Sequence, residues 1–399
     1  MKYVKLFLLT VVVLCSFSNE KIPKIDLPAH TPKQTAQMSK LFRKVRYVPL
    51  ETTDDCLLSY IHVQKIQDYI LAWDYDSCCL FSAKDGKFIR RIGHKGDDPE
   101  AVFSFYNNFY NPYDGLLYFQ GVEGIRVKYG LDGKYVGKMK VPLSTGVSPQ
   151  FVVPLDLTTF CAFFANRSGR EKKRIVLFDH NGNVKKEFPN HHFVETKMYI
   201  LDTGDGLTYR YKDNLYFKEM FIDTVYQVSK NQLKAEYILN ITSRSVPYKE
   251  RYDRHKEAIS PYFIYENDVN IAFRYHMNGV GQLCVYNKQA GESSYYLCEN
   301  GPIDDINGFM PVWISTICDD GTCLGVLNAG DICDYIDKNG NLILVDYKTD
   351  YVKVGNENEL REKYKTQIEL YSRALEKAFG KKVDERYLYS VYLGKEIPI

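Results

Sequence analysis

Residues 80–92 read LFSAKDGKFIRRI, two short apolar runs joined by an Asp-Gly turn, and this pattern points to the fold class. It returns in residues 127–139, VKYGLDGKYVGKM, and again in residues 175–188, IVLFDHNGNVKKEF. Turn signals of this kind recur at spacings of roughly 47 to 59 residues along the chain. They are Asp85-Gly86-Lys87, Asp132-Gly133-Lys134, Asn181-Gly182-Asn183, Asn231-Gln232, Ala290-Gly291-Glu292 and Asn339-Gly340-Asn341.

The period is the size of one four-stranded propeller blade, so the turn signals predict six blades. The strands between the turns are short and closely spaced, which indicates hairpins and not crossover helices. The 33 Tyr and 22 Phe residues also favour β-structure. We therefore expect a mainly β fold, with a six-bladed β-propeller over residues 45–330 and a small α/β segment over residues 331–399.

Three stretches carry a resemblance to a known family: residues 47–61, YVPLETTDDCLLSYI; residues 80–102, LFSAKDGKFIRRIGHKGDDPEAV; and residues 304–313, DDINGFMPVW. Over about residues 40–335 the chain resembles exported bacterial six-bladed β-propellers. The resemblance implies a binding or interaction module with its ligand at the mouth of the central funnel. A carbohydrate, a peptide and a protein all stay open as that ligand.

Ring closure has a candidate in residues 48–50, which precede the first full blade. A leading strand commonly completes the last blade of a propeller and so removes the exposed sheet edges. We expect these residues to pair with the region of residues 318–327.

The first residues predict export. Lys2 and Lys5 precede an apolar run from Leu6 to Phe17 that is short for a membrane span, so residues 1–18 are typical of a signal peptide. Cys15 offers a site for lipid attachment and membrane anchoring, although Leu14 is a poor residue before a lipidated cysteine. Residues 19–44 are polar and contain prolines, which favours a linker. We expect a periplasmic or outer-surface location.

The C-terminal stretch holds residues whose spacing implies chemistry. An apolar run ends in Asp346-Tyr347-Lys348, which is typical of a buried strand. Because strand side chains alternate, Asp346 and Lys348 share one face and Tyr347 takes the other. A helix is predicted next, between Asn358 and Gly380. Within it, Gln367 and Tyr371 are four residues apart and stand on the same face.

The DYK strand, the helix with Gln367 and Tyr371, and residues 385–394, ERYLYSVYLG, carry a second resemblance. Over about residues 335–399 the chain resembles the C-terminal part of the RecB/AddA-type nucleases, a branch of the PD-(D/E)-x-K family. The resemblance implies a Mg²⁺-dependent deoxyribonuclease that binds DNA, with Asp334 and Asp346 as metal ligands and Lys348 as the catalytic lysine. Gln367 and Tyr371 would support the site.

Asp334 is expected on a hairpin strand that turns at Asn339-Gly340 into the DYK strand. The Asn339-Gly340 turn therefore belongs to two predictions, the sixth turn of the propeller and the hairpin of the nuclease segment. The helix that precedes these residues in the nuclease family is not found. No G-x-x-x-x-G-K-[ST] phosphate loop occurs in the sequence, so we expect no ATPase or helicase motor in this polypeptide.

Two hypotheses for function follow, a binding module at the propeller funnel and an active Mg²⁺-dependent nuclease at the C-terminus. A third is an enzyme that acts on a carbohydrate or lactone in the funnel. The formal net charge of +2 is small, whereas nucleic-acid-binding proteins are typically strongly basic. Residues 105–113, FYNNFYNPY, suit either stacking on a ligand or packing between blades.

The ten cysteines show no C-x-x-C pair, which argues against a zinc site. Cys284 with Cys298, or Cys318 with Cys323, could be bridged in an oxidising compartment. The alternative, which we favour, is that most cysteines are small buried apolar residues.

Overall fold

The computed structural model describes residues 21–27, 32–145, 147–194, 206–219, 221–241, 247–250, 260–277, 279–318, 320–339, 343–379 and 382–399. The chain forms two compact units, one of Met1–Asn307 with Trp313–Gly325 and one of Gly308–Val312 with Val326–Ile399. The predicted signal peptide, residues 1–18, and the predicted lipidation site, Cys15, lie outside the described residues. Both stay predictions.

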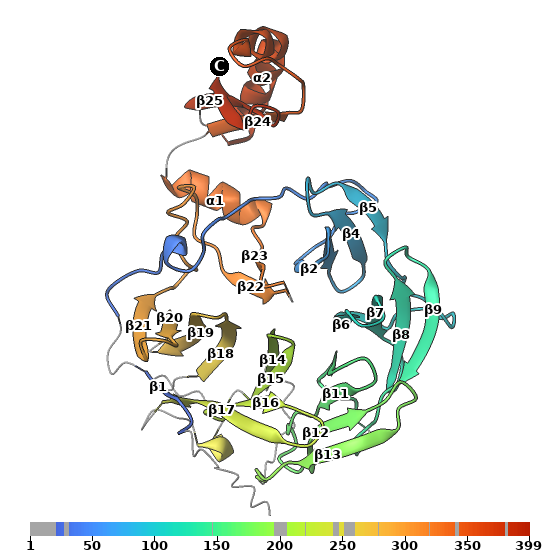
Figure 1. Ribbon diagram of the computed structural model, residues 1–399. Coiled ribbons are helices and arrows are strands. Elements are labelled where there is room, and N and C mark those ends of the chain that lie inside the picture. The colour runs from blue at the N-terminus through green and yellow to red at the C-terminus, as the bar shows by residue number, and fades with distance from the viewer. Residues whose placement is uncertain are drawn as a thin grey trace, which may run out of the picture. The chain divides into compact units, whose positions relative to one another are not determined.

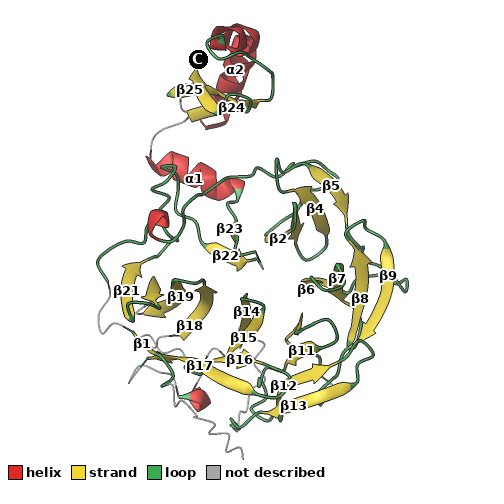
Figure 2. Cartoon of the chain, viewed as in Figure 1, coloured by secondary structure: helices red, strands yellow, loops and turns green. Residues whose placement is uncertain are grey.

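The first unit is built from antiparallel sheets that succeed one another along the chain (Figures 1 and 2). Three sheets have four strands each, and their bounds are β2–β5 (His62–Ile66, Tyr69–Trp73, Cys78–Ser82, Phe88–Arg91), β6–β9 (Ser104–Asn111, Leu116–Gln120, Ile125–Gly130, Tyr135–Lys140) and β10–β13 (Phe151–Pro154, Phe160–Phe163, Lys173–Phe178, Val184–Pro189). The next two are β14–β17 (Gly206–Tyr211, Asn214–Glu219, Thr224–Val228, Leu233–Asn240) and β18–β21 (Ser260–Glu266, Asn270–Met277, Val280–Asn287, Glu292–Leu297).

A two-stranded sheet of β22 (Ile314–Ile317) and β23 (Cys323–Gly325) follows in this unit. It contacts β2 of the first sheet, and Figure 1 shows the sheets arranged around a ring. The backbone amide of Lys65 donates to the sulfur of Cys318 over 3.2 Å, and the Lys65 ammonium pairs with Asp320. The ring is thus closed by contacts between the last sheet and the first.

Five of the six predicted turns join the third and fourth strands of successive sheets, which confirms the repeat. Asp85-Gly86 shows why glycine is needed there. Gly86 has φ +73°, and a Cβ at this position would lie 1.9 Å from the carbonyl oxygen of Pro49. The sixth predicted turn differs, because Asn339 is the last residue of a helix.

The leading segment does not complete the last sheet as expected. The amide of Glu51 donates to the Gly86 carbonyl, so residues beside 48–50 lie against the turn of the first sheet. The close approach of Pro49 to Gly86 places this segment there, and the prediction of pairing near residues 318–327 is therefore wrong.

The stretch predicted as a linker also differs from expectation in its described part. β1 (Lys24–Asp26) pairs in parallel with β17, at the edge of the fourth sheet. Thr35 bridges to Leu297 and Gln37 to Ile303, and a short 3₁₀ helix follows at Met38–Lys40. Backbone hydrogen bonds hold this segment along two sheet edges. The segment covers edge N–H and C=O groups that could otherwise pair with the strands of another chain.

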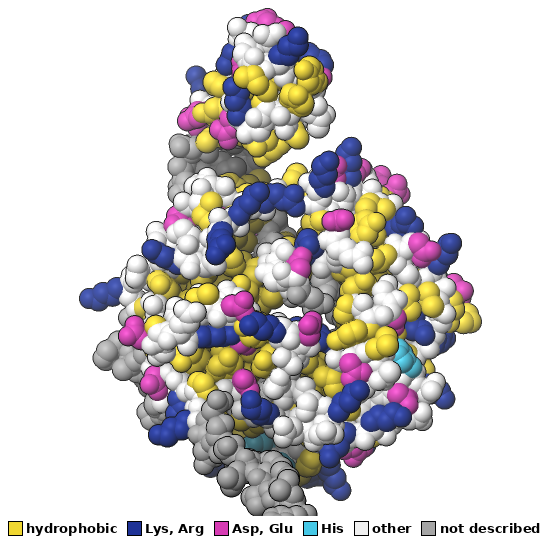
Figure 3. Space-filling view, viewed as in Figure 1, with side chains coloured by type: hydrophobic (Ala, Val, Ile, Leu, Met, Phe, Trp, Pro, Cys, Tyr) yellow, Lys and Arg dark blue, Asp and Glu magenta, His cyan; other side chains and the backbone are white. Residues whose placement is uncertain are grey.

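The core of the first unit lies between neighbouring sheets. One cluster joins Phe105 and Phe119 of the second sheet to Leu71 and Leu80 of the first. Comparable clusters join the second sheet to the third, the third to the fourth and the fourth to the fifth. Phe and Tyr rings fill these wedges, which accounts for the high aromatic content. Figure 3 shows charged side chains of both signs interspersed over one face of this unit.

The second unit contains a three-stranded sheet of β24 (Ile343–Lys348), β25 (Glu385–Ser390) and β26 (Lys395–Pro398), with β24 parallel to β25. Its helices are α1 (Ala329–Asn339) and α2 (Glu357–Phe379). Leu360 and Ile368 of α2 pack on Leu344 and Leu388 of the sheet, which confirms the apolar stripe expected for this helix.

All nine cysteines that the structure describes are free, and seven of them are buried. The bridges considered between Cys284 and Cys298 and between Cys318 and Cys323 are not formed, and the expectation of buried apolar residues is confirmed. Among the described residues, no helix is long and apolar enough to cross a membrane.

Candidate functional site

The second unit brings four of the five predicted nuclease residues together. Lys348 Nζ lies 2.9 Å from Asp346 Oδ2 and donates to Gln367 Oε1 over 3.2 Å. Gln367 Nε2 in turn donates to Tyr371 Oη over 2.7 Å. The Lys348 ammonium also lies 4.1 Å from the centre of the Tyr364 ring. We call Asp346, Lys348, Gln367 and Tyr371 the C-terminal polar chain.

Two local patterns produce this chain. Alternation along β24 places Asp346 and Lys348 on one face, while Tyr347 is exposed and contacts the ring of Tyr389. The four-residue spacing on α2 places Gln367 one turn before Tyr371. The polar chain runs from side chains only 15% and 11% exposed, at Asp346 and Lys348, to the more exposed Tyr371.

Asp334 is not on a strand. It lies within α1, so the hairpin expected between it and β24 is wrong, and its turn residue Gly340 lies outside the described residues. The side chain of Asp334 is not among those the structure describes. The helix has a physical basis, because Asn328 and Asp331 are hydrogen-bonded at its start and the sequence AGDICDYIDKN places apolar residues one turn apart.

The carboxylates near the polar chain do not by themselves suit Mg²⁺, which prefers several oxygen ligands in octahedral geometry. Asp346 is paired with Lys348, and Asp350 accepts hydrogen bonds from Lys363 and Tyr364. Among the side chains that the structure describes, no three His, Cys, Asp or Glu residues are grouped to hold a metal ion. The described donors therefore fall short of the two carboxylates that the resemblance implies.

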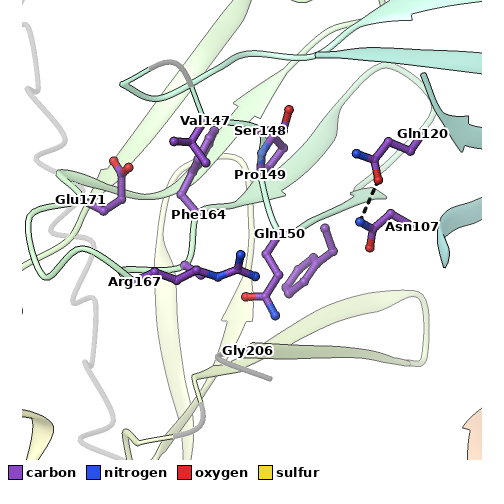
Figure 4. Close-up of a pocket in the computed structure, with 12 residues that line it drawn as sticks. Asn107, Gln120, Val147, Ser148, Pro149, Gln150, Phe164, Arg167, Glu171 and Gly206 are labelled. Atoms are coloured by element: carbon purple, nitrogen blue, oxygen red, sulfur yellow. Dashed lines mark hydrogen bonds between the residues drawn. The ribbon is translucent and has the colours of Figure 1, made fainter. Parts of the chain in front are cut away.

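The first unit contains a cavity of about 410 Å³. It opens where the third sheet begins, and it is lined by Asn107, Gln120, Gln150, Phe151, Phe164, Arg167 and Glu171 among others (Figure 4). Its volume is within the range of about 300–1,000 Å³ typical of small-molecule sites. Apolar rings and polar groups line it together, which is the usual composition of such a site.

Arg167 is the cavity's cation. Its Nε is buried without a hydrogen-bond partner, and the guanidinium has no ion pair among the described residues. Figure 4 shows the guanidinium pointing toward the amide of Gln150. Burying a guanidinium nitrogen without a partner is unfavourable, and an anionic ligand would supply the missing acceptor.

Glu171, the cavity's acid, is already engaged. Its Oε1 accepts from Ser144 Oγ over 2.6 Å and from the Lys173 amide over 2.9 Å. The Glu171 amide donates to Asn166 Oδ1, which closes the turn that carries Arg167. These bonds fix the loop at residues 166–171, and Glu171 therefore serves to hold Arg167 in place.

On the opposite side of the cavity, Asn107 Nδ2 donates to Gln120 Oε1 over 3.0 Å. This bond leaves the Asn107 carbonyl and the Gln120 amino group at opposite ends of the pair (Figure 4). Within the described part of the chain neither atom has another hydrogen bond. An acceptor and a donor on one wall suit ligand hydroxyl groups, which both donate and accept.

Sequence reasoning missed this cavity. Gln120, Gln150 and Arg167 come from two different sheets and show no motif, and only the packing of neighbouring sheets brings them together. Asn107 lies in the aromatic run that the sequence marked, residues 105–113. Residues of that run fit both expected roles, packing between blades and exposure to a ligand. Phe105 and Phe109 are buried, whereas Tyr106 and Tyr113 are exposed.

A ring of antiparallel sheets that pack through aromatic wedges, with a cavity at their ends, defines a mainly β, propeller-like protein. A model of the family described as Domain of unknown function (DUF4934) matches residues 22–366, and the chain belongs to that family. A solved structure, a putative exported protein from Bacteroides fragilis, is similar in fold, with a TM-score of 0.59 and 16% identity. The similarity covers 80% of this chain and 92% of that one.

A second similarity is local. The chain is 51% identical over 70 residues to the AddA-type subunit of the ATP-dependent helicase/nuclease from Clostridium beijerinckii, and 46% identical over 79 residues to its namesake from Acetivibrio thermocellus. These matches cover 18% and 19% of this chain but only 6% of each relative. Residues 1–21 and 367–399 lie outside the family match, and neither stretch can hold 70 residues. The two similarities therefore overlap.

Proposed function

We propose that the chain is an exported six-bladed β-propeller that works as a binding module, in the periplasm or on the outer cell surface. β22 and β23 form its incomplete sixth blade, and the ligand occupies the cavity at the mouth of the ring. The fold similarity to a putative exported protein supports export.

The observation that carries this proposal is the cavity with Arg167. A fold held together by tightly packed aromatic wedges has left about 410 Å³ open, and a buried guanidinium nitrogen in it lacks a partner among the described residues. Buried polar groups in folded proteins are nearly always hydrogen-bonded, and an exception calls for a partner such as a water, an ion or a ligand. A bound ligand would supply the missing acceptor.

A test is ligand-observed NMR with the purified full chain and a fixed set of probes: methyl β-D-glucoside, methyl β-D-glucuronide, N-acetylglycine and trialanine. Ser148 and Ala165 line the cavity, so Ser148→Trp and Ala165→Leu would fill it. We expect at least one probe to bind the wild type and to lose its signal in both filled variants. Unfolding midpoints near that of the wild type would show that both variants fold. Signals that are absent, or unchanged by filling the cavity, would contradict the proposal.

A second candidate function is DNA cleavage by the second unit, with Mg²⁺ as cofactor and Asp334 as the further ligand beside Asp346. It is favoured by the C-terminal polar chain, in which β24 and α2 hold Lys348 between Asp346 and Gln367. The 51% local identity to part of a helicase/nuclease supports nuclease descent of this unit. The ammonium of Lys348 is positioned to stabilise negative charge on a phosphate.

Cleavage of linear double-stranded and single-stranded DNA with Mg²⁺ or Mn²⁺ tests this function. Asp346→Ala and Lys348→Ala should each abolish cleavage. Tyr347→Ala is the matched control, because Tyr347 lies between them on the opposite, exposed face of β24. If the wild type and all variants are equally inactive, the proposed nuclease function would be contradicted, and only nuclease descent would remain.

A further inference from the structure

We infer that the cavity of the first unit binds an acidic saccharide, with the carboxylate on Arg167 and the sugar hydroxyls on the amide side chains. This inference rests on the proposed binding function and names its ligand class. Three features support it: the charge in the cavity, the hydrogen-bonding pattern of its wall and an aromatic cluster beside it.

The Arg167 guanidinium favours an acid. Glu171 also lines the cavity, but one of its oxygens accepts hydrogen bonds from the Ser144 hydroxyl and the Lys173 amide, whereas Arg167 has no ion pair among the described residues. A planar guanidinium binds a carboxylate through two parallel hydrogen bonds, which is the strongest polar contact available to it. A ligand with one carboxylate would satisfy the buried Nε of Arg167.

The opposite wall selects hydroxyl groups. The pair of Asn107 and Gln120 keeps one carbonyl and one amino group for a ligand after their mutual bond of 3.0 Å. Neighbouring hydroxyls of a pyranose ring present a matching donor and acceptor. The pair lies across from Arg167 and Gln150 in Figure 4, so a ligand in the cavity has an amide wall on one side and the guanidinium on the other.

An aromatic cluster stands next to this wall. Tyr106 precedes Asn107 in β6, so the two Cα atoms are about 3.8 Å apart. The ring of Tyr106 contacts His62 with centroids 5.2 Å apart and Tyr75 with centroids 5.9 Å apart. Tyr75 and Tyr106 are 55% and 43% exposed, which is unusual for aromatic rings held in a packed cluster.

The backbone of β6 explains why the aromatic cluster and the Asn107–Gln120 pair occur together. Its pairing with β7 shifts register between Ser104 and Phe109, and Asn108 Nδ2 donates to the Phe105 carbonyl within the irregular stretch. Such bulges redirect side chains beside binding sites. The irregularity presents Tyr106 and Asn107 as neighbours, one to the aromatic cluster and one to the cavity.

The cluster is rigid and carries a cation. His62 stacks on Trp73 with centroids 5.8 Å apart, and Lys95 Nζ lies 3.8 Å from the centre of the Tyr75 ring. Burial lowers the pKa of His62, so its ring is neutral near pH 7. Exposed rings bind the C–H faces of sugars, and a further saccharide unit that leaves the cavity would lie on Tyr106.

The experiment compares two probes that differ only at carbon 6, methyl β-D-glucuronide and methyl β-D-glucoside, on the full chain by titration calorimetry or NMR. We expect the glucuronide to bind at least about tenfold more tightly, because charge-assisted hydrogen bonds are about twice as strong as neutral ones. Arg167→Gln should remove that preference. Arg90→Gln is the matched control, since Arg90 lies on β5 and donates to the Asp132 carbonyl.

Tyr106→Ala should leave the binding of both monosaccharide probes unchanged, because its ring would meet only a further saccharide unit. If the two glycosides bind equally well and Ser148→Trp abolishes the binding of both, the acidic preference would be overturned. The proposed binding function would still stand. Binding of N-acetylglycine as tight as that of the glucuronide would overturn the saccharide assignment. Failure of the glucuronide to bind while trialanine binds would overturn the inference and favour a peptide site.

Discussion

The candidate sites of the two units differ in how their cations are held. In the second unit Lys348 lies within ion-pair distance of Asp346 and donates to Gln367, which donates to Tyr371, although Asp346 Oδ2 itself has no hydrogen bond of good geometry. In the first unit Arg167 faces a cavity with no ion pair among the described residues. A cation beside a carboxylate of its own unit contributes to stability, whereas a cation without one is available to a ligand.

The contrast is sharper inside the first unit, between Arg167 and Arg174. Arg174 Nε lies 2.9 Å from Glu219 Oε2, and its guanidinium lies over the rings of Phe217 and Tyr226. The two arginines are in the same sheet region and both have a buried Nε without a hydrogen bond of good geometry, yet of the two only Arg174 lies within ion-pair distance of a described carboxylate. If pairing marks a structural role and its absence a binding role, substitutions at the two positions should differ in their effects.

The largest effect is expected for Arg174→Met, which leaves Glu219 buried without its cation. Removing one partner of a buried pair destabilises a protein by about 3–5 kcal/mol. Urea unfolding of the full chain measures the change. Arg174→Met with Glu219→Gln should recover part of the loss, and a single variant as stable as the wild type would show that this pair has no structural role.

Lys348→Met in the second unit should destabilise it by about 1–3 kcal/mol, because Asp346 keeps its charge in a mostly buried position. Asp346→Asn combined with Lys348→Met should be less harmful than the sum of the single changes. A double-mutant cycle from unfolding curves gives the coupling. Strictly additive effects would mean that the 2.9 Å contact is not a working ion pair.

Lys218 provides a pH test in the first unit. It is fully buried, its Nζ donates to the Glu219 carbonyl, and burial lowers its pKa to about 7. The unfolded chain then binds more protons above pH 7, so stability should rise with pH by up to about 1.4 kcal/mol per unit. Unfolding of the wild type and of Lys218→Met at pH 7.0 and 8.0, below the usual Cys pKa of about 8.5, measures the Lys218 contribution as the difference between the two pH slopes.

Lys218→Met should lack this contribution, since methionine does not titrate. A variant whose stability changes with pH in the same way as that of the wild type would contradict a neutral Lys218 in the folded state.

The smallest stability change is expected for Arg167→Met. The side chain has no hydrogen-bond or ion-pair partner among the described residues, so the free energy of unfolding should change by no more than about 0.5 kcal/mol. Unfolding curves beside Arg174→Met provide the comparison. A loss as large as that of Arg174→Met would mean that Arg167 is paired in the folded protein and that the cavity is not a binding site.

The repeat could be predicted from the sequence because each hairpin turn is local. Asp85-Gly86 needs a positive φ at glycine, and that requirement is visible in two residues. The face shared by Asp346 and Lys348 was also predictable, since alternation along a strand is local as well. The polar chain on α2 followed from a four-residue spacing.

Features that depend on contacts between distant segments were not predictable. Residues 48–50 lie on the turn at Gly86 because of a close backbone approach, which no pattern in the sequence announces. Asp334 was placed on a strand because the adjacent Asn339-Gly340 resembles a hairpin turn, yet the run from Ala329 is helical. Arg167 and Gln120 meet only because neighbouring sheets pack side by side.

The binding role of the first unit depends on a carboxylate-bearing ligand at Arg167, and a crystal structure of the full chain soaked with methyl β-D-glucuronide would show whether it binds there. We predict the carboxylate within about 3 Å of the Arg167 guanidinium, with sugar hydroxyls on Asn107 and Gln120. An Arg167 side chain paired with a carboxylate of its own chain, in a cavity that excludes the glucuronide, would contradict that role.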